Sequence, residues 1–269
     1  MTSHLSLRPF GLVAATFALV LAVGLGACSA PGPGHPPGEP FDPYEKLNRQ
    51  VHEFNKNVDR AFLRPVSRGY SAFMPDDIET AIKRFAVNLS IPQAVVNNIL
   101  QGNMKGATED TYRFVVNTTI GLGGFFDPAS ELGMPEATDS DFGKTLHVWG
   151  VREGAYIESP FFGPSTERAA TGKIVDIFTN PLRYAVDTPD RYWGSVVDAS
   201  AGLSRRGRFS ETIDSVLYDS ADSYAQARSL YLQNRRFKLG GRGEETYLDP
   251  YDDPYGATDE APHDDPYAE

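Results

Sequence analysis

Apolar residues return every three or four positions along most of the chain, and this period constrains the fold more than any other feature. The first such stretch begins at Asp42, where the acid, a proline and Glu45 three positions later form the pattern of a helix-capping box. Pro65 should end this helix, because proline disfavours a helical backbone in the residue before it. One face of the predicted helix carries Leu47, Val51, Phe54, Val58 and Phe62, and the other carries Asn48, Arg49, Asn55 and Asn57.

The same period, together with capping and breaking residues, predicts a mainly α-helical body with little strand. Pro92 should separate two of the helices, and Asp127 with Pro128 should cap a short helical turn. The main candidate for a strand is one extended piece over residues 155–162. Arg205, Arg206 and Arg208 are expected in a small basic loop. Helices are expected over residues 76–89, 92–102, 104–119, 165–180 (with Ser165 as N-cap), 191–203 and 210–237, the last as one helix or a helix pair.

The stretch from Asp141 to Arg168 is neither a regular helix nor a regular strand. Four glycines and two prolines interrupt it, yet large apolar and aromatic side chains lie between them. A surface loop rarely carries so many aromatics, and a packed helix rarely carries so many breakers. We expect a short helix, a flexible turn near Gly150 to Gly154, and an extended piece that reaches Pro164. Judged locally, the stretch fits an irregular core connection as well as a functional site.

The N-terminus has the pattern of a lipoprotein signal. Arg8 precedes an apolar run from Phe10 to Val23, which has the length of a signal-peptide core and is short for a membrane span. Ala27 stands before the only cysteine of the chain, Cys28, as in the lipobox of bacterial lipoproteins. This resemblance implies cleavage before Cys28 and acylation of Cys28, and the serine that follows favours the outer membrane. The alternative is an ordinary secretory signal with a chance cysteine.

Composition divides the chain into a signal peptide (1–27), a Pro/Gly-rich tether that should be extended (28–41), a helical domain (42–239) and an acidic tail (240–269). The tail carries ten acids and one base, and it repeats Asp-Pro-Tyr, which predicts disorder. Of the total charge of −11, the remaining 239 residues therefore hold only −2. Because nucleic-acid binding needs a basic face, this distribution argues against it.

No motif in the sequence assigns a reaction. Only His52 and His147 fall in the predicted body, and each is more typical of a half-buried or surface residue than of a metal ligand. The Gly-x-Ser-x-Gly pattern of many hydrolases is missing, and the glycine run at 121–124 lacks the lysine of a phosphate-binding loop. We therefore expect no enzyme, no metal and no cofactor. Carboxylates that meet only on folding leave no sequence pattern, so a hydrolase stays open, with a site near His147.

Helices with apolar and amide-rich faces allow three arrangements. They can lie in a membrane interface, surround a ligand cavity, or pack as a water-soluble bundle. Periodicity alone does not separate these arrangements.

Five sets of motifs occur in an order and spacing that are specific when taken together. They are DPYEKLNRQVHEFN (42–55) with Arg64-Pro65-Val66, NLSIPQAVVNNILQG (88–102), RFVVNTTIGLGGFFDPA (113–129), parts of the stretch from Asp141 to Arg168, and the Tyr-x-x-x-Arg-x-x-Tyr-Leu run that ends at Leu232. In these motifs the chain resembles the VacJ/MlaA family of outer-membrane lipoproteins, over about residues 42–236.

This resemblance implies a ring-like arrangement of amphipathic helices in the membrane, around a central amphipathic channel. Family members remove mislocalised glycerophospholipids from the outer leaflet of the outer membrane and pass them to a soluble periplasmic carrier, which maintains lipid asymmetry. They associate with trimeric porins and are not enzymes. For this chain the resemblance implies a lipid-anchored protein on the periplasmic side of the outer membrane, with phospholipid as cargo. The alternative is a periplasm-facing scaffold or lipid-binding lipoprotein without a channel.

Two glycine-rich segments are the candidates for a channel lining or a hinge. Gly150 and Gly154 would let a loop flex at the mouth of the channel, and stiffening either one with proline should impair lipid traffic while leaving the protein folded. Arg168 is followed by Ala169 where the family usually has aspartate, which makes Arg168 a candidate contact for a phosphate head group. The full set of candidates is Gly121, Leu122, Gly123, Gly124, Phe125, Phe126, Trp149, Gly150, Gly154, Phe161, Phe162 and Arg168.

Overall fold

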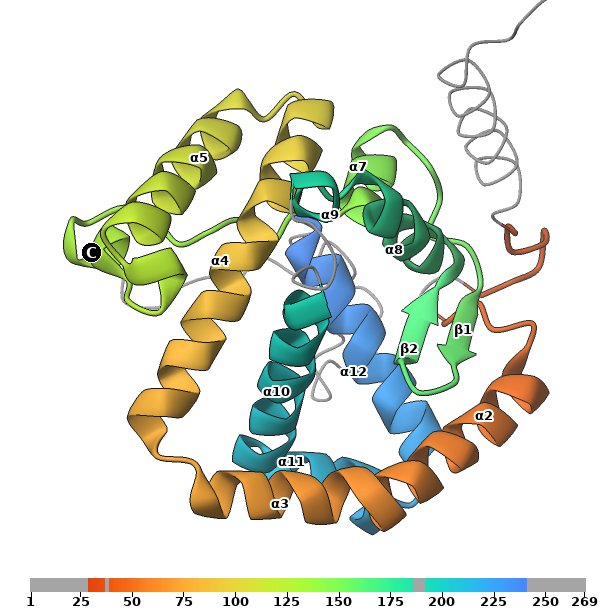
Figure 1. Ribbon diagram of the computed structural model, residues 1–269. Coiled ribbons are helices and arrows are strands. Elements are labelled where there is room, and N and C mark those ends of the chain that lie inside the picture. Colours follow the sequence, from red (N-terminus) through yellow and green to blue (C-terminus); the bar gives the residue numbers. More distant parts are fainter. Residues whose placement is uncertain (1–28, 37–38, 186–191, 241–269) are drawn as a thin grey trace, which may run out of the picture.

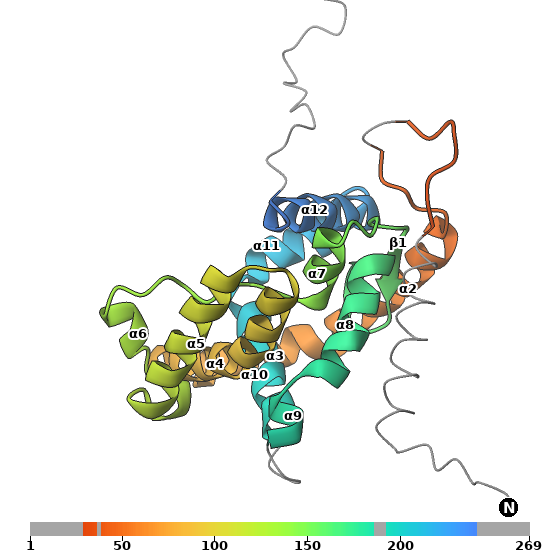
Figure 2. The same cartoon turned by 90° about the horizontal axis from the view of Figure 1, so that it is seen from above.

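The computed structural model is a body of helices with a small β-hairpin at its edge (Figure 1). The structure describes residues 29–36, 39–185 and 192–240. The predictions for the signal peptide, for lipidation of Cys28 and for the acidic tail from residue 241 lie outside these residues. Figure 2 shows α12 (Ser223–Lys238) on one face of the molecule and α9 (Leu182–Ala185) on the opposite face. The mainly helical class that the periodicity predicts is confirmed.

The first helical segment runs past Pro65 instead of ending before it. α2 (Glu45–Val58) continues through a π-helical turn, η1 (Asp59–Leu63), into α3 (Arg64–Phe73), whose first turn holds Pro65. Proline lacks an amide donor and clashes with the carbonyl four residues before it in a regular helix, and the wider π-helical turn, in which the Arg64 amide donates to the Asp59 carbonyl, comes directly before Pro65. The expected capping box is also wrong, since Tyr44 is the N-cap of α2 and no side chain caps it. The Asp42 carboxylate instead accepts hydrogen bonds from Asn48, Tyr224 and Arg228.

A single helix, α4 (Asp76–Leu100), replaces the two helices expected around Pro92. The proline removes one backbone donor, but α5 and α10 pack along α4 and outweigh that loss. The bounds of α5 (Met104–Thr119) agree with the prediction. A 3-10 turn, η2 (Leu122–Gly124), follows, and Asp127 caps α6 (Pro128–Glu131) as predicted.

The stretch that begins at Asp141 folds into a short helix, a turn and a β-hairpin. Asp141 caps α7 (Phe142–Val148), and β1 (Tyr156–Ser159) pairs antiparallel with β2 (Gly163–Thr166). In this register Tyr156 is opposite Thr166 and Ser159 is opposite Gly163. The short helix and the turn are as predicted. The single extended piece is instead the first strand of the hairpin together with its tip, because the chain reverses at residues 160–162.

α8 (Glu167–Thr179) begins one residue later than predicted. Thr166 rather than Ser165 is the N-cap, and the Thr166 hydroxyl accepts a hydrogen bond from the Ala169 amide at 3.3 Å. The helix ends at Thr179 with Asn180 as its C-cap, which agrees with the expected end at Asn180-Pro181.

The C-terminal part of the body contains α10 (Tyr192–Arg208), α11 (Ser210–Asp214), a π-helical turn η3 (Ser215–Asp219) and α12. The interruption at residues 220–222 agrees with the predicted helix pair. The expected basic loop is wrong, because its three arginines lie in the last turn of α10. Buried ion pairs from Arg206 to Asp59 and Asp214 hold this turn in place.

Candidate functional site

In the described part of the molecule, many large apolar side chains are exposed and many polar side chains are buried. There, buried polar and charged side chains outnumber buried hydrophobic ones. Phe73, Phe162 and Phe237 are 90%, 80% and 78% exposed, respectively. Water-soluble monomers seldom expose apolar surface on this scale, so it indicates contact with a protein, a ligand or a membrane. Among the described residues, the two buried apolar clusters are small. One consists of Phe142, Leu146 and Val175, and the other of Tyr156, Tyr224 and Leu232.

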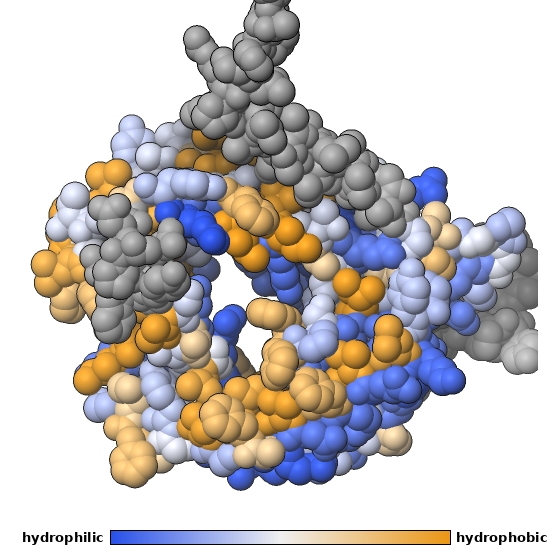
Figure 3. All heavy atoms as spheres, turned by 45° about the vertical axis from the view of Figure 1, so that its right-hand side comes forward, coloured by the Kyte–Doolittle hydropathy of each residue, from blue (hydrophilic) through white to orange (hydrophobic). Residues whose placement is uncertain are grey.

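An opening passes between the helices, and both hydrophobic and hydrophilic residues border it (Figure 3). A border of this mixed kind suits a molecule that has an apolar part and a charged part. Within the described part of the chain, every helix is too short or too polar to cross a bilayer by itself.

The first bend (residues 121–124) is a tightly packed joint after α5. A Cβ on Gly121 would lie 2.5 Å from the carbonyl oxygens of Asn117 and Phe126, and a Cβ on Gly124 would lie less than 3.0 Å from Asn88. The Asn88 amide also donates to the Gly123 carbonyl at 2.9 Å. Any larger side chain at Gly121 or Gly124 must therefore displace α4 or the backbone of the bend.

Apolar side chains project from this first bend. Leu122 has a φ angle of 51°, a left-handed conformation that leucine rarely adopts, and its side chain is mostly exposed. The Phe125 ring stacks on Phe85 of α4, with centroids 4.6 Å apart. Phe126 is exposed. Of the predicted candidates in this segment, the glycines form the joint and the apolar residues form the surface.

The second bend (residues 150–154) joins α7 to β1 and is looser. Gly150 and Gly154 have φ angles of 83° and 75°, a region that favours glycine. Among the described atoms, a Cβ on Gly150 would meet nothing within 4 Å, whereas a Cβ on Gly154 would lie 2.5 Å from Oε2 of Glu167. Just before the bend, the Trp149 indole donates to the Leu100 carbonyl at 3.0 Å. Space to move is therefore concentrated at Gly150, between two anchored positions.

Phe161 and Phe162 form the exposed tip of the hairpin. Phe161 has a φ angle of 65°, and its ring packs edge-on against Phe54 of α2, with centroids 5.2 Å apart. A groove of about 330 Å³ lies beside this contact. The tip and the groove together make one apolar surface, lined by Leu47, Gln50, Val51, Phe54, Pro160 and Phe161.

Arg168 is buried, so the geometry does not support the predicted contact with a phosphate head group. Its side chain is 4% exposed, and Nη1 donates to the Val151 carbonyl at 2.9 Å. His147 lies 3.4 Å from the same guanidinium. Burial and the nearby Arg168 charge lower the pKa of His147, which keeps the imidazole neutral near pH 7. Arg168 thus ties α8 to the second bend.

Two asparagines on α2 hold the hairpin through its backbone, which the sequence alone did not reveal. Asn48 and Asn55 are seven residues apart and therefore lie two turns apart on one face. Each side chain donates to one hairpin carbonyl and accepts from one hairpin amide. The four bonds join Asn48 to the Tyr156 carbonyl (3.0 Å) and the Glu158 amide (2.9 Å), and Asn55 to the Ser159 carbonyl (3.1 Å) and the Phe161 amide (2.8 Å).

His52 is buried, not half-buried or exposed as predicted. Its Nε2 lies 3.1 Å from the Ser223 hydroxyl and its Nδ1 lies 3.4 Å from the Glu158 carboxylate, in the order of a hydrolase triad. All three side chains are buried, Lys56 Nζ lies 3.4 Å from the same hydroxyl, and the Tyr156 hydroxyl donates to Glu158. The contacts among His52, Glu158 and Ser223 therefore join α2, β1 and α12. Among the described residues, no group of three His, Cys, Asp or Glu side chains is placed to hold a metal ion.

A buried ion-pair network joins the end of α10 to the α2–α3 segment. Arg206 donates to both oxygens of Asp59 at 2.8 Å and to Asp214 at 2.6 Å, and Arg64 donates to Asp214 from α3 at 2.7 Å. Bidentate pairs of this kind fix geometry as well as charge. Sequence reasoning missed the network because 147 positions separate Arg206 from Asp59.

The family model for the MlaA lipoprotein matches residues 40–238. The chain belongs to the MlaA lipoprotein family. The matched MlaA segment includes both bends, the hairpin, the two asparagines of α2 and the Arg206 network.

Several relatives are similar along most of their length. The intermembrane phospholipid transport system lipoprotein MlaA of Haemophilus influenzae is 33% identical over 227 residues, which cover 82% of this chain and 88% of that protein. Its Escherichia coli counterpart is 32% identical over 219 residues, covering 79% and 82%. A protein of Rickettsia prowazekii is 34% identical over 192 residues, covering 71% and 75%.

One solved structure, from work on the structural basis for maintenance of bacterial outer membrane lipid asymmetry, has a TM-score of 0.62 and 31% sequence identity. The match covers 74% of this chain and 98% of that one.

Proposed function

We propose that this protein removes mislocalised glycerophospholipids from the outer leaflet of the outer membrane and passes them to a soluble periplasmic carrier. It does so as the lipoprotein component of an intermembrane phospholipid transport system, and it thereby maintains lipid asymmetry. The observation that carries the proposal is the combination of many exposed apolar side chains on the exterior with an opening of mixed polarity.

The exterior suits a protein that lies in a membrane interface. Exposed aromatic and aliphatic side chains gain free energy when lipid replaces water around them. Polar groups inside such a protein must find partners within it, because hydrocarbon offers none. Arg113 with Asp127 at 2.6 Å and Asn98 with Asp110 at 2.8 Å are two internal pairs of this kind.

The opening suits the cargo. A glycerophospholipid has an anionic head and two apolar tails, so its path needs polar groups next to apolar walls. Leu122, Phe125 and Phe126 at the first bend and Phe161 and Phe162 at the hairpin tip are the proposed contacts for acyl chains. Gly150 is the proposed flexing point near the mouth, with Trp149 and Gly154 as its fixed neighbours.

Acylation of Cys28 would anchor the protein on the periplasmic side of the outer membrane. A trimeric porin is the proposed partner in the membrane, and a soluble lipid carrier is the proposed partner in the periplasm. No chemical step is needed in this function, because the lipid is moved and not changed.

Deletion of the gene should raise phospholipid in the outer leaflet and increase sensitivity to detergent, and the wild-type gene should restore both. Surface phospholipid that stays unchanged in a clean deletion would contradict the proposal.

A Cys28→Ser variant separates this function from that of a scaffold or lipid-binding lipoprotein without a channel. If the body itself lies in the membrane, the variant still needs detergent after purification. Full solubility in water would favour the scaffold.

A further inference from the structure

The segment that follows Cys28 is fastened to the body at both of its ends. At its start, the Ser29 backbone amide donates to Oε2 of Glu167 at 2.7 Å, and the Ser29 hydroxyl lies 2.8 and 2.9 Å from the two carboxylate oxygens. At its end, the Phe41 carbonyl accepts from the Tyr156 amide at 2.8 Å, at the edge of β1. The expectation of a free, extended tether is wrong for these two positions.

The body prepares the Glu167 carboxylate for this contact. Glu167 is the first residue of α8, where the helix dipole favours a negative charge. The Ala155 amide donates to its Oε2 at 3.2 Å, and the Glu167 amide donates back to the Ala155 carbonyl at 3.0 Å. The missing Cβ of Gly154 leaves the space that the Glu167 side chain occupies. The base of the hairpin therefore contributes to orienting the carboxylate, beside the contacts from the tether.

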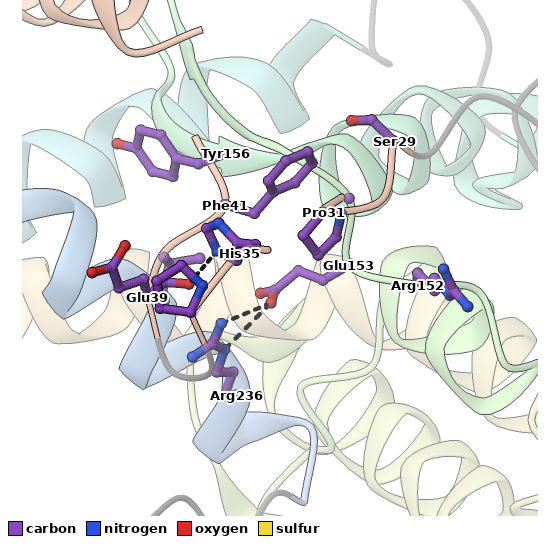
Figure 4. Close-up of a pocket in the computed structure, with 12 residues that line it drawn as sticks. Ser29, Pro31, His35, Glu39, Phe41, Arg152, Glu153, Tyr156 and Arg236 are labelled. Carbon is purple, nitrogen blue, oxygen red and sulfur yellow. Dashed lines mark hydrogen bonds and ion pairs between the residues drawn. The ribbon is translucent and has the colours of Figure 1, made fainter. Parts of the chain in front are cut away.

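Between its two ends the tether covers a cavity of about 320 Å³ (Figure 4). Pro31 and Phe41 of the tether lie on one side of it, and Glu153 and Arg236 of the body lie on the other. The His35 ring packs edge-on against Phe41, with centroids 5.6 Å apart, and its Nε2 lies 3.0 Å from the Glu39 carbonyl. The tether thus has internal contacts as well as its two attachments.

We propose that Glu167 is a docking site for the residue after the acylated cysteine, and that this contact fixes the point on the body where the lipid anchor leaves it. The inference rests on the proposed acylation of Cys28.

Chain dimensions show why the contact matters. A tether held only at Phe41 would let Ser29 reach about 40 Å away, at 3.3–3.6 Å per residue. That is more than the roughly 30 Å hydrocarbon thickness of a bilayer, so a free tether would not orient the body. With Ser29 held on Glu167, the neighbouring Cys28 lies about 3.8 Å away, measured between Cα atoms. The acyl chains then enter the membrane beside the start of α8 and the base of the hairpin.

A distance measurement on the full, acylated protein tests the docking. Acylation blocks the only native thiol, so Ala30→Cys and Gln233→Cys give two sites for spin labels, one on the tether and one on the exposed face of α12. Pulsed electron paramagnetic resonance should give one narrow distance peak. That peak should be lost in Glu167→Ala and weakened in Glu167→Gln, which keeps the shape but removes the charge.

Two further variants make the result specific. Ser29→Ala removes one donor from the tether, leaves the body unchanged and should also weaken the peak. Glu153→Gln alters an acid on the wall of the same cavity that pairs with Arg236, at 3.3 Å, and should leave the peak intact.

A broad distribution in the unaltered protein, or a narrow peak that survives Glu167→Ala, would overturn the docking. The intact mass reports acylation separately. An unmodified Cys28 would overturn the anchor and with it the orienting role, whereas an acylated Cys28 with a broad distribution would overturn the docking alone.

Discussion

The first bend (residues 121–124) and the second bend (residues 150–154) are both rich in glycine, follow a helix and stand beside exposed aromatics, but they differ in packing. In the first bend, Gly121 and Gly124 touch a neighbouring backbone or helix so closely that no Cβ fits. In the second bend, Gly150 has open space around it among the described residues, and only Gly154 is packed. In the first bend, glycine therefore allows neighbouring atoms to approach the backbone closely. In the second bend, it mainly allows a backbone conformation with positive φ.

This difference assigns different mechanical roles. A joint whose backbone is in close contact with its neighbours transmits a movement without bending, whereas a residue at positive φ in open space can change its angles without collision. Both bends were sequence candidates for a channel lining or a hinge, and the specific hinge hypothesis was placed on Gly150 and Gly154. The packing keeps that hypothesis for Gly150 and removes it for the first bend.

The largest effect should come from Gly124→Ala. The new Cβ would lie less than 3.0 Å from Asn88 of α4, at a φ angle of 105° that alanine disfavours. Overpacking and backbone strain together should lower the free energy of unfolding by about 3 kcal/mol or more. Denaturant unfolding of the detergent-solubilised protein measures the loss.

Gly133→Ala is the matched control, because Gly133 also has a positive φ, 73°, but open space for a Cβ. It should lower the free energy of unfolding only through backbone strain, by about 1 kcal/mol. Equal losses in the two variants would show that contact with α4 does not fix the first bend.

Gly154→Ala should have an intermediate effect. Its Cβ would lie 2.5 Å from Oε2 and 2.8 Å from Cβ of Glu167, so the glutamate must move away. Because part of that side chain can rotate, we expect the free energy of unfolding to fall by about 2 kcal/mol, which is less than for Gly124→Ala. The same movement should release Ser29 and broaden the tether distance. A variant that loses stability but keeps a narrow tether distance would contradict this coupling.

Gly150→Ala should lower the free energy of unfolding by about 1 kcal/mol, because Gly150 has a φ angle of 83°. Gly150→Asn should lower it less, because asparagine tolerates this region of backbone angles. If Gly150 is the flexing point, Gly150→Ala should reduce phospholipid transport more than Gly133→Ala does at equal stability. Equal transport in the two variants would make the second bend a structural support only.

Proline is not a suitable stiffening residue at position 150. It cannot adopt the positive φ, and the Gly150 amide donates to the His147 carbonyl at 2.9 Å. Proline would therefore remove the turn instead of restraining it.

The elements that were predictable from sequence are those whose stop signals act locally. α5 begins after a capping asparagine and ends at a glycine-rich turn, and α6 and α7 begin after Asp127 and Asp141. The failures occur where distant residues decide. α4 continues past Pro92 because other helices pack along it, and α10 extends to Arg208 because Arg206 pairs with Asp59, far away in sequence.

The candidate site shows the same limit. The glycine and aromatic residues were visible as a pattern, but the sequence did not show which glycines are packed or that Arg168 is buried. The pairing of Asn48 and Asn55 with the hairpin was also hidden, because an amide on a helix face has no pattern that names its partner. The seven-residue spacing of the two asparagines was the one available signal.

Lowering the pH should destabilise the structure beside both bends by a similar amount, which should be smaller than the effects of the glycine substitutions. Asp127 caps α6 after the first bend, and Asp141 caps α7 before the second. Burial alone would raise the pKa of Asp127, but hydrogen bonds from Ser130 and Asn117 and the Arg113 charge hold it below its ordinary value of 3.8. Burial would likewise raise the pKa of Asp141, but Arg235, with hydrogen bonds of 2.6 and 2.8 Å, holds it below 3.8.

A depressed aspartate pKa stabilises the fold at pH values above the unfolded value, and this stability is lost as the pH falls through the folded value. The melting temperature should therefore fall below about pH 4, the ordinary aspartate range. Asp127→Asn and Asp141→Asn keep an acceptor for the helix cap but do not titrate, so each should make this fall shallower by a similar amount. The slope should not vanish, because a hydrogen bond from Ser204 and the nearby Arg208 also lower the pKa of Glu79. If only Asp141→Asn changed the slope, the first bend would be held by packing alone, and the two bends would differ in electrostatics as well as in contact.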